Sequence, residues 1–203
     1  MSIEGNGLGL FAHQAEIQGE TGARLQHGAL CYKLTRKGVL VLLVTSRDTG
    51  RWLLPKGWPN EGLTPAQSAA REARDEGGAE GVMQDECLGL IRYEKIVPGQ
   101  PPMACIVAIF PLRVQALAPR YREKHQRRRK WLTPEQAAAL VQEPDAVDML
   151  LAFSTHPLVQ PVSEPVVQSG AKLASKPALK AGLKAGLKAG LKAGKIRQKR
   201  DKG

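Results

Sequence analysis

The sequence has few cysteines, no signal-peptide pattern in its first twenty residues and no long hydrophobic run. Its cysteines are an odd number in apolar surroundings without Cys-x-x-Cys or Cys/His spacing, which argues against a disulfide framework or a zinc site. Residues 1–20 lack the basic start and apolar centre of a signal peptide, and no later run approaches the roughly 20 apolar residues of a membrane span. We therefore expect a cytoplasmic protein without a transmembrane segment. The cysteines are Cys31, Cys87 and Cys105.

Acidic residues are nearly absent from the C-terminal end. Residues 170–203 contain eleven Lys or Arg and one acid, Asp201, so they carry +10 of the formal charge of +11. Four copies of Leu-Lys-Ala-Gly fill residues 179–194, and each Gly costs a helix about 1 kcal/mol relative to Ala. We expect a disordered tail that binds nucleic acid or an anionic surface without sequence preference, since it has no aromatic side chain for base stacking. The alternative is a solubilising extension.

What the sequence does contain is a well-marked helix after a glycine loop, within residues 55–79. Thr64, Pro65 and Gln67 have the spacing of an N-cap, a first-turn proline and a capping-box partner. Small residues then recur at helical spacing, which predicts a buried stripe that lets the helix approach a sheet closely. The helix should end at Gly77 and Gly78. The stripe is Ala66, Ala69, Ala70 and Ala73.

Three carboxylates, Glu72, Asp75 and Glu76, lie within about 100° of the helix circumference beside this stripe. Their mutual repulsion is relieved by a divalent cation, and hard oxygen ligands suit Mg²⁺ or Mn²⁺. Taken alone, the same spacing is also typical of a solvated helix face. The preceding loop, with Gly57, favours a metal site that acts on phosphate.

From Gly57, the segment reads G-x5-L-x7-R-E-A-x-D-E-x-G-A and closely resembles the Nudix box, G-x5-E-x7-R-E-U-x-E-E-x-G-U, where U is aliphatic. Asp75 stands in place of one Glu, and Leu63 stands in place of another. Residues 24–58 and the basic segment ending at Leu132 also look like the branch that hydrolyses diphosphoinositol and diadenosine polyphosphates. The resemblance covers residues 24–153. The matching positions are Gly57, Arg71, Glu72, Glu76 and Gly78, with Ala73 and Ala79 at the aliphatic positions.

The resemblance implies a Mg²⁺-dependent hydrolase of phosphoanhydrides, with a nucleoside diphosphate-X or diphosphoinositol polyphosphate type of substrate. It implies metal binding by Glu72, Asp75 and Glu76, a general base that is Glu72 or Glu76, and Arg71 as the residue that orients the acids. Because Leu63 and Asp75 depart from the box, the alternative is a non-catalytic nucleotide sensor or adaptor localised by the basic tail. The residues expected to contact a polyanionic substrate are Arg47, Lys56, Gly57 and Arg129, and Glu123 is a candidate for a further metal oxygen.

The remaining pattern predicts an α/β/α sandwich with a mixed sheet, the shape of a Nudix-like fold. The apolar run 39–45 reads as a buried strand with 29–34 as its antiparallel partner. A second capped helix should begin at Thr133 and Pro134. We expect a flexible segment at 1–22, a Nudix domain at 23–156, and a Pro-rich linker with the repeat tail at 157–203. Further strands are expected at 52–54, 87–96, 103–114 and 120–132, and a further helix at 145–153.

Overall fold

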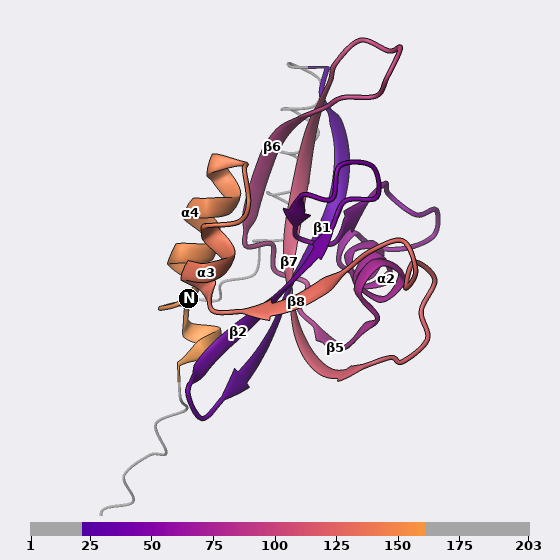
Figure 1. The fold of residues 1–203 in the computed structure, drawn as a ribbon. Helices are drawn as coiled ribbons and strands as arrows, with labels where there is room; N and C mark the ends of the chain where they lie inside the picture. Colours follow the sequence, from indigo (N-terminus) through magenta and orange to yellow (C-terminus); the bar gives the residue numbers. More distant parts are fainter. Residues whose placement is uncertain (1–21, 161–203) are drawn as a thin grey trace, which may run out of the picture. The chain divides into compact units, whose positions relative to one another are not determined.

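The computed structural model describes residues 22–160, so the predictions for the N-terminal segment and the repeat tail lie outside the described residues. Figure 1 shows these elements in chain order. The strands are β1 (Arg24–Thr35), β2 (Gly38–Thr45), β3 (Trp52–Leu53), β4 (Lys56–Gly57), β5 (Ala79–Met83), β6 (Gly89–Lys95), β7 (Met103–Leu117) and β8 (Arg129–Leu132). The helices are α2 (Pro65–Gly77), α3 (Pro134–Ala138) and α4 (Pro144–Phe153), followed by a 3-10 helix, η1 (Pro157–Val159).

The strands form a mixed sheet with the order β3-β2-β1-β7-β5. β1 runs parallel to β7, with Arg24 opposite Cys105, and the other strand pairs are antiparallel. β1 and β2 form the expected hairpin, in which Tyr32 faces Val41. Off the main path, β4 pairs with β1, β6 with β7 and β8 with β2.

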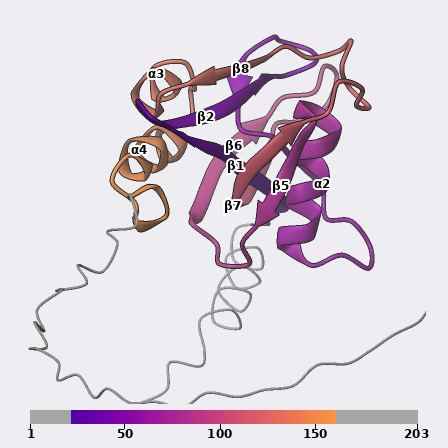
Figure 2. The same ribbon diagram turned by 90° about the horizontal axis from the view of Figure 1, so that it is seen from below.

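Helices cover both faces of the sheet, as Figures 1 and 2 show, with α2 on one face and α3 and α4 on the other. β1 is apolar on both faces for this reason: Ala29 and Cys31 pack in the cluster of α2, while Leu30 and Tyr32 pack in the opposite cluster. The predicted α/β/α sandwich with a mixed sheet is confirmed.

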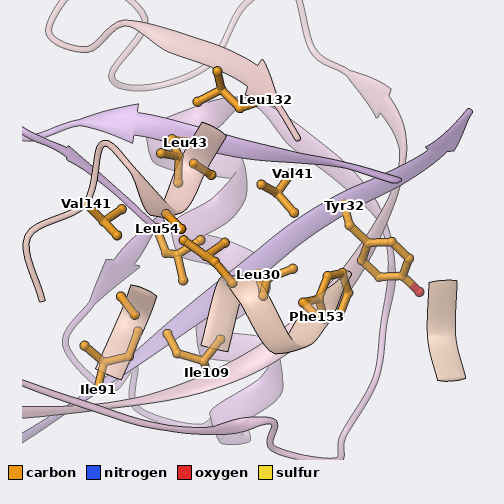
Figure 3. Packing of buried hydrophobic residues seen from close by; sticks show 14 of the residues in the cluster. Leu30, Tyr32, Val41, Leu43, Leu54, Ile91, Ile109, Leu132, Val141 and Phe153 are labelled. Carbon is orange, nitrogen blue, oxygen red and sulfur yellow. The ribbon is translucent and has the colours of Figure 1, made fainter. Parts of the chain in front are cut away.

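The larger apolar cluster lies between the sheet and the helices α3 and α4 (Figure 3). Its centre includes Leu30, Val41 and Ile109 from the sheet and Phe153 from α4, all within 2% of complete burial. The rings of Tyr32 and Phe153 meet edge to face with centroids 5.1 Å apart, a favourable aromatic geometry. This cluster holds α3 and α4 against the face of the sheet opposite α2.

The smaller apolar cluster and the capping residues at the two helix ends set the position of α2. Ala66, Ala69 and Ala73 are buried against the sheet, as the small-residue stripe predicts. Thr64 accepts a hydrogen bond from the Gln67 backbone and completes the expected capping box, while the next residue after the helix, Gly78, ends it with φ of 64°. Both helix ends are therefore confirmed.

One predicted strand was too long, and one strand was not predicted. The segment predicted as a strand over 120–132 is extended only in β8, because residues 118–128 turn over the C-terminal end of α2, with the Glu123 backbone N–H donating to Asp75 O (3.0 Å). β5 was not expected, because its sequence AEGVM is mostly exposed and lacks an apolar run. The 3-10 helix η1 follows α4, and its Leu158 packs against the larger cluster. Between residues 22 and 160, no helix has the length and apolarity needed to cross a bilayer.

Candidate functional site

The glycine loop and the box helix meet at one close contact. β4 pairs with β1, which places Gly57 opposite His27 and in front of α2. A Cβ added at residue 57 would lie 2.6 Å from Glu72 Oε1 and nearer still to the other carboxylate atoms. The Glu72 carboxylate therefore lies directly against the backbone of residue 57, in space that a side chain would fill.

This contact opens onto a cleft of about 540 Å³. Its walls come from the loop after β2, β4 and the residues that follow it, α2, the end of β6 and the loop before β8. Charged side chains of both signs line it in equal number. They are Arg47, Arg51, Lys56, Lys95 and Arg127 on the basic side, and Asp48, Glu72, Glu76, Glu94 and Glu123 on the acidic side.

Glu76 is the most enclosed acid of the site, with 4% of its surface exposed. Its Oε2 accepts the backbone N–H of Lys56 (3.1 Å), and its Oε1 pairs with the guanidinium of Arg127. Burial raises the pKa of Glu76 to about 7, against the opposing effect of the Arg127 charge. Both carboxylate oxygens thus have partners on separate elements.

Glu72 has a different environment, although it lines the same cleft. Within residues 22–160, no Lys or Arg nitrogen lies within 4 Å of its carboxylate. Burial is the main cause that raises its pKa, and the charges of Asp75 and Glu123 act in the same direction. Among the box acids that line the cleft, Glu72 is therefore the one without an ion pair in the described residues, and it is available to a cation.

The third acid of the box does not line the cleft. Asp75 lies 3.3 Å from Arg122 Nη1 and 3.9 Å from Arg71 Nε. The box arginine Arg71, whose side chain is 53% exposed, forms no ion pair with Glu72 or Glu76. In the described part of the chain, no three His, Cys, Asp or Glu side chains form a group ready to hold a metal ion.

The arginine next to the acids of the cleft is Arg127. The sequence had suggested Arg71 for this position. Its side chain is 8% exposed and bridges Glu76 of α2 and Glu123 of the loop before β8, with Nε 2.5 Å from Glu123 Oε2. The sequence offers no means of telling Arg127 from its basic neighbours. Its importance arises only when the loop folds over α2.

The sheet side of the cleft carries a chain of polar groups. Lys56 Nζ donates to Tyr93 Oη (3.1 Å), and Tyr93 Oη donates to Gln26 Oε1 (2.6 Å). Burial lowers the pKa of Lys56, although Glu76 and Glu143 oppose that change. Sequence reasoning missed Tyr93 and Gln26, which are brought together only by the pairing of β1, β7 and β6.

The other residues expected to contact substrate differ in position. Arg47 lines the cleft 3.8 Å from Glu123, with an exposed side chain. Arg129 does not line it: its Nη1 donates to Gly77 O (2.6 Å), and its guanidinium covers the ring of Tyr121. Arg129 therefore donates to the last backbone carbonyl of α2, and the C-terminal end of a helix is a favourable position for a cation.

Trp58 forms part of the cleft wall directly after the glycine of β4. The guanidinium of Arg24 lies 4.3 Å from its ring centroid, and Lys95 Nζ lies 4.9 Å from it. Two cations at this range hold an indole in place by cation–π attraction. Leu63, where the Nudix box has Glu, is 38% exposed on the loop before α2.

The chain is similar to known proteins in sequence and in fold. A family model described as the NUDIX domain matches residues 24–153. Over 146 residues the chain is 30% identical to Nudix hydrolase 16, mitochondrial, of Arabidopsis thaliana, covering 65% of this chain and 80% of that protein. Two solved structures with 20% identity share the fold at a TM-score of 0.50. They are an Ap4A hydrolase of C. elegans in a binary complex (65% and 96% of the two chains) and the dihydroneopterin triphosphate pyrophosphohydrolase of E. coli (64% and 94%).

Proposed function

The chain belongs to the Nudix hydrolase family, and on that premise we propose that it hydrolyses a phosphoanhydride bond with the help of Mg²⁺, for which Mn²⁺ can substitute. The observation that carries the proposal is the contact of Glu72 with the backbone of Gly57 at the wall of a cleft lined by further acids and bases. That contact puts a carboxylate with no cationic partner, among the described residues, where a polyphosphate can reach it.

Glu72 and Glu76 would hold the ion, since both are hard oxygen donors on the same cleft. Asp75 would become a third ligand only by giving up its ion pair with Arg122. When bound, Mg²⁺ neutralises diphosphate oxygens and lowers the pKa of a coordinated water. The donor chemistry fits this ion, which needs only one or two protein carboxylates beside water and phosphate.

The residues around the acids would bind and orient the substrate. Lys56 presents an ammonium group that donates to Tyr93, and Arg47 presents an exposed guanidinium on the loop after β2. These two groups, from different elements, can contact phosphate oxygens. Either Glu72 or Glu76 would accept the proton of the attacking water, and burial prepares both for that role by raising the pKa.

The charge balance of the cleft supports a polyanionic substrate. Five basic and five acidic side chains cancel, so a divalent cation makes the cleft positive. A nucleoside diphosphate-X or diphosphoinositol polyphosphate substrate has the matching charge. The resemblance of residues 24–58 to the diphosphoinositol and diadenosine polyphosphate branch favours those two classes first.

The test is product release by the full chain with Mg²⁺ from a panel of substrates. The panel contains diphosphoinositol polyphosphates, diadenosine polyphosphates, ADP-ribose, dihydroneopterin triphosphate and 5'-triphosphorylated RNA. Glu72→Gln should abolish turnover and leave the fold intact, because Glu72 forms no ion pair among the described residues and Gln has its shape. Glu94→Gln, on an acid of the same cleft that comes from β6 and is not among the atoms nearest Gly57, is the matched control and should retain turnover.

Turnover that survives Glu72→Gln would refute the assigned site. Binding of a panel member without turnover by the wild type would favour the non-catalytic sensor or adaptor. A cytoplasmic location and nucleic-acid or anionic-surface binding by residues 170–203 stay predictions.

A further inference from the structure

The feature that carries a further inference is the guanidinium of Arg127, a protein cation inside an acidic site. Nε donates to Glu123 Oε2 (2.5 Å), Nη2 pairs with Glu76, and Nη1 donates to Thr45 O (2.8 Å). These acceptors belong to a loop, a helix and the end of β2, respectively. A planar fork of donors is suited to bridging two carboxylates in this way, whereas an ammonium group is not.

The neighbours of Arg127 show that this position is specific. Arg128 is exposed and lies over the ring of Trp52, 5.6 Å from its centroid. Arg129 binds Gly77 O at the end of α2. Arg127 is nevertheless drawn into the cleft between two acids, which would repel each other if it were absent.

A divalent cation would satisfy the same two carboxylates. Oxygens of Glu76 and Glu123, from separate elements, contact neighbouring nitrogens of one guanidinium, and carboxylates from separate elements are the ligands of paired metal sites in phosphate-processing enzymes. Glu72 lies on the same cleft but, in residues 22–160, forms no ion pair with Arg127 or with another cation. The cleft thus has one cation position filled by the chain itself and a second at Glu72.

We propose that Arg127 is a positioning residue that replaces one divalent cation between Glu76 and Glu123, so that the cleft binds a single ion near Glu72. This inference rests on the proposed metal-dependent function. Arg127 thereby holds the loop before β8 against α2 and limits the metal content of the site. Removal of its charge should open the second position.

The test counts Mn²⁺ bound to the full chain by electron paramagnetic resonance during a titration. We expect about one ion per wild-type chain and about two per Arg127→Gln chain. Arg127→Lys keeps a positive charge and should stay near one. The matched control is Arg128→Gln, which removes the same charge from the adjacent exposed residue and should also stay near one.

Thermal denaturation gives a second readout that does not depend on turnover. Without metal, Arg127→Gln removes the buried counterion that Glu76 and Glu123 share and should melt at a lower temperature than the wild type. Mn²⁺ should raise its Tm by more than it raises the wild-type Tm, because ligand binding adds to stability. Equal increases in the two proteins would contradict the proposal.

A charge-balanced variant covers the case in which Arg127→Gln does not fold. Glu123→Gln/Arg127→Gln removes the ion pair without changing the net charge, and Glu76, a proposed ligand of the ion beside Glu72, is then no longer shared with Arg127. It should bind its first Mn²⁺ about tenfold more tightly than the wild type. Unchanged or weaker binding would overturn the proposal.

The two proposals fail in different ways. If the wild type binds no Mn²⁺ and releases no product from any substrate, the metal-dependent function is wrong. If the wild type binds its ion and turns over, while Arg127→Gln binds no additional ion, the inference about Arg127 alone is wrong. A second ion in Arg128→Gln would also overturn it, since a general charge effect would then explain the count.

Discussion

Substitution of Gly57 by Ala should separate catalysis from folding. The backbone of residue 57 lies outside the left-handed region, so Ala can adopt its conformation. The new methyl group would lie 2.6 Å from Glu72 Oε1, whereas ordinary contacts begin at 3.4 Å. The carboxylate must therefore retreat by about 1 Å, and it can do so because it ends a flexible side chain.

The size of the effect follows from that displacement. A misplacement of about 1 Å in a catalytic group costs about 100-fold in rate, which is about 2.7 kcal/mol of transition-state stabilisation. Stability should change little, since Gly57 meets the tip of a side chain and not the backbone. We expect kcat/KM to fall by about two orders of magnitude and Tm to shift by at most about 4 °C.

The assay is kcat/KM on the best substrate of the panel, combined with thermal denaturation, for the wild type, Gly57→Ala and Glu72→Gln. Because both changes act on one carboxylate, Gly57→Ala should lie between the wild type and the inactive Glu72→Gln in rate. Full activity of Gly57→Ala would refute the reasoning. So would a collapse of its Tm.

Further predictions concern stability. Leu63→Glu should change the free energy of unfolding by less than about 0.5 kcal/mol in urea denaturation, since Leu63 is largely exposed; loss of folding would show that it belongs to the core. Gly78→Ala should destabilise by about 1–3 kcal/mol and lower Tm, because φ is 64° and a Cβ would lie 2.7 Å from Arg129 and Tyr121; an unchanged Tm would contradict this. Burial lowers the pKa of His27 below 6.5, so the native state favours the neutral imidazole. The free energy of unfolding should therefore decrease as the pH falls from 6.5 towards the native pKa. In urea denaturation, His27→Leu should make the free energy of unfolding depend less on pH over this range.

The fold was largely predictable because its signals are local. Thr64, Pro65 and Gln67 define the start of α2 by adjacent hydrogen bonds, and the apolar run 39–45 predicts β2 without reference to other segments. β5 was missed because its pairing is supplied by the long neighbour β7. The extent of β8 was also wrong, because turns over α2 compete with the extended conformation in residues 118–128.

The candidate site was less predictable because it depends on contacts between distant segments. Glu72, Glu76 and Gly57 line one cleft and were identified through the spacing of a single motif. Asp75 has the same helical spacing but faces Arg122, which comes from a loop whose path the motif does not determine. Arg127 has a role only after that loop folds, so residue type and spacing could not distinguish it from Arg129.

The parallel pairing of β1 with β7 has a consequence for synthesis of the chain. Arg24 and Cys105 are roughly 80 residues apart, so the first strand leaves the ribosome long before its central partner exists. In that interval, the hairpin of β1 and β2 must keep an apolar edge out of contact with other nascent chains. This edge is where we expect premature association to begin when translation slows before residue 103.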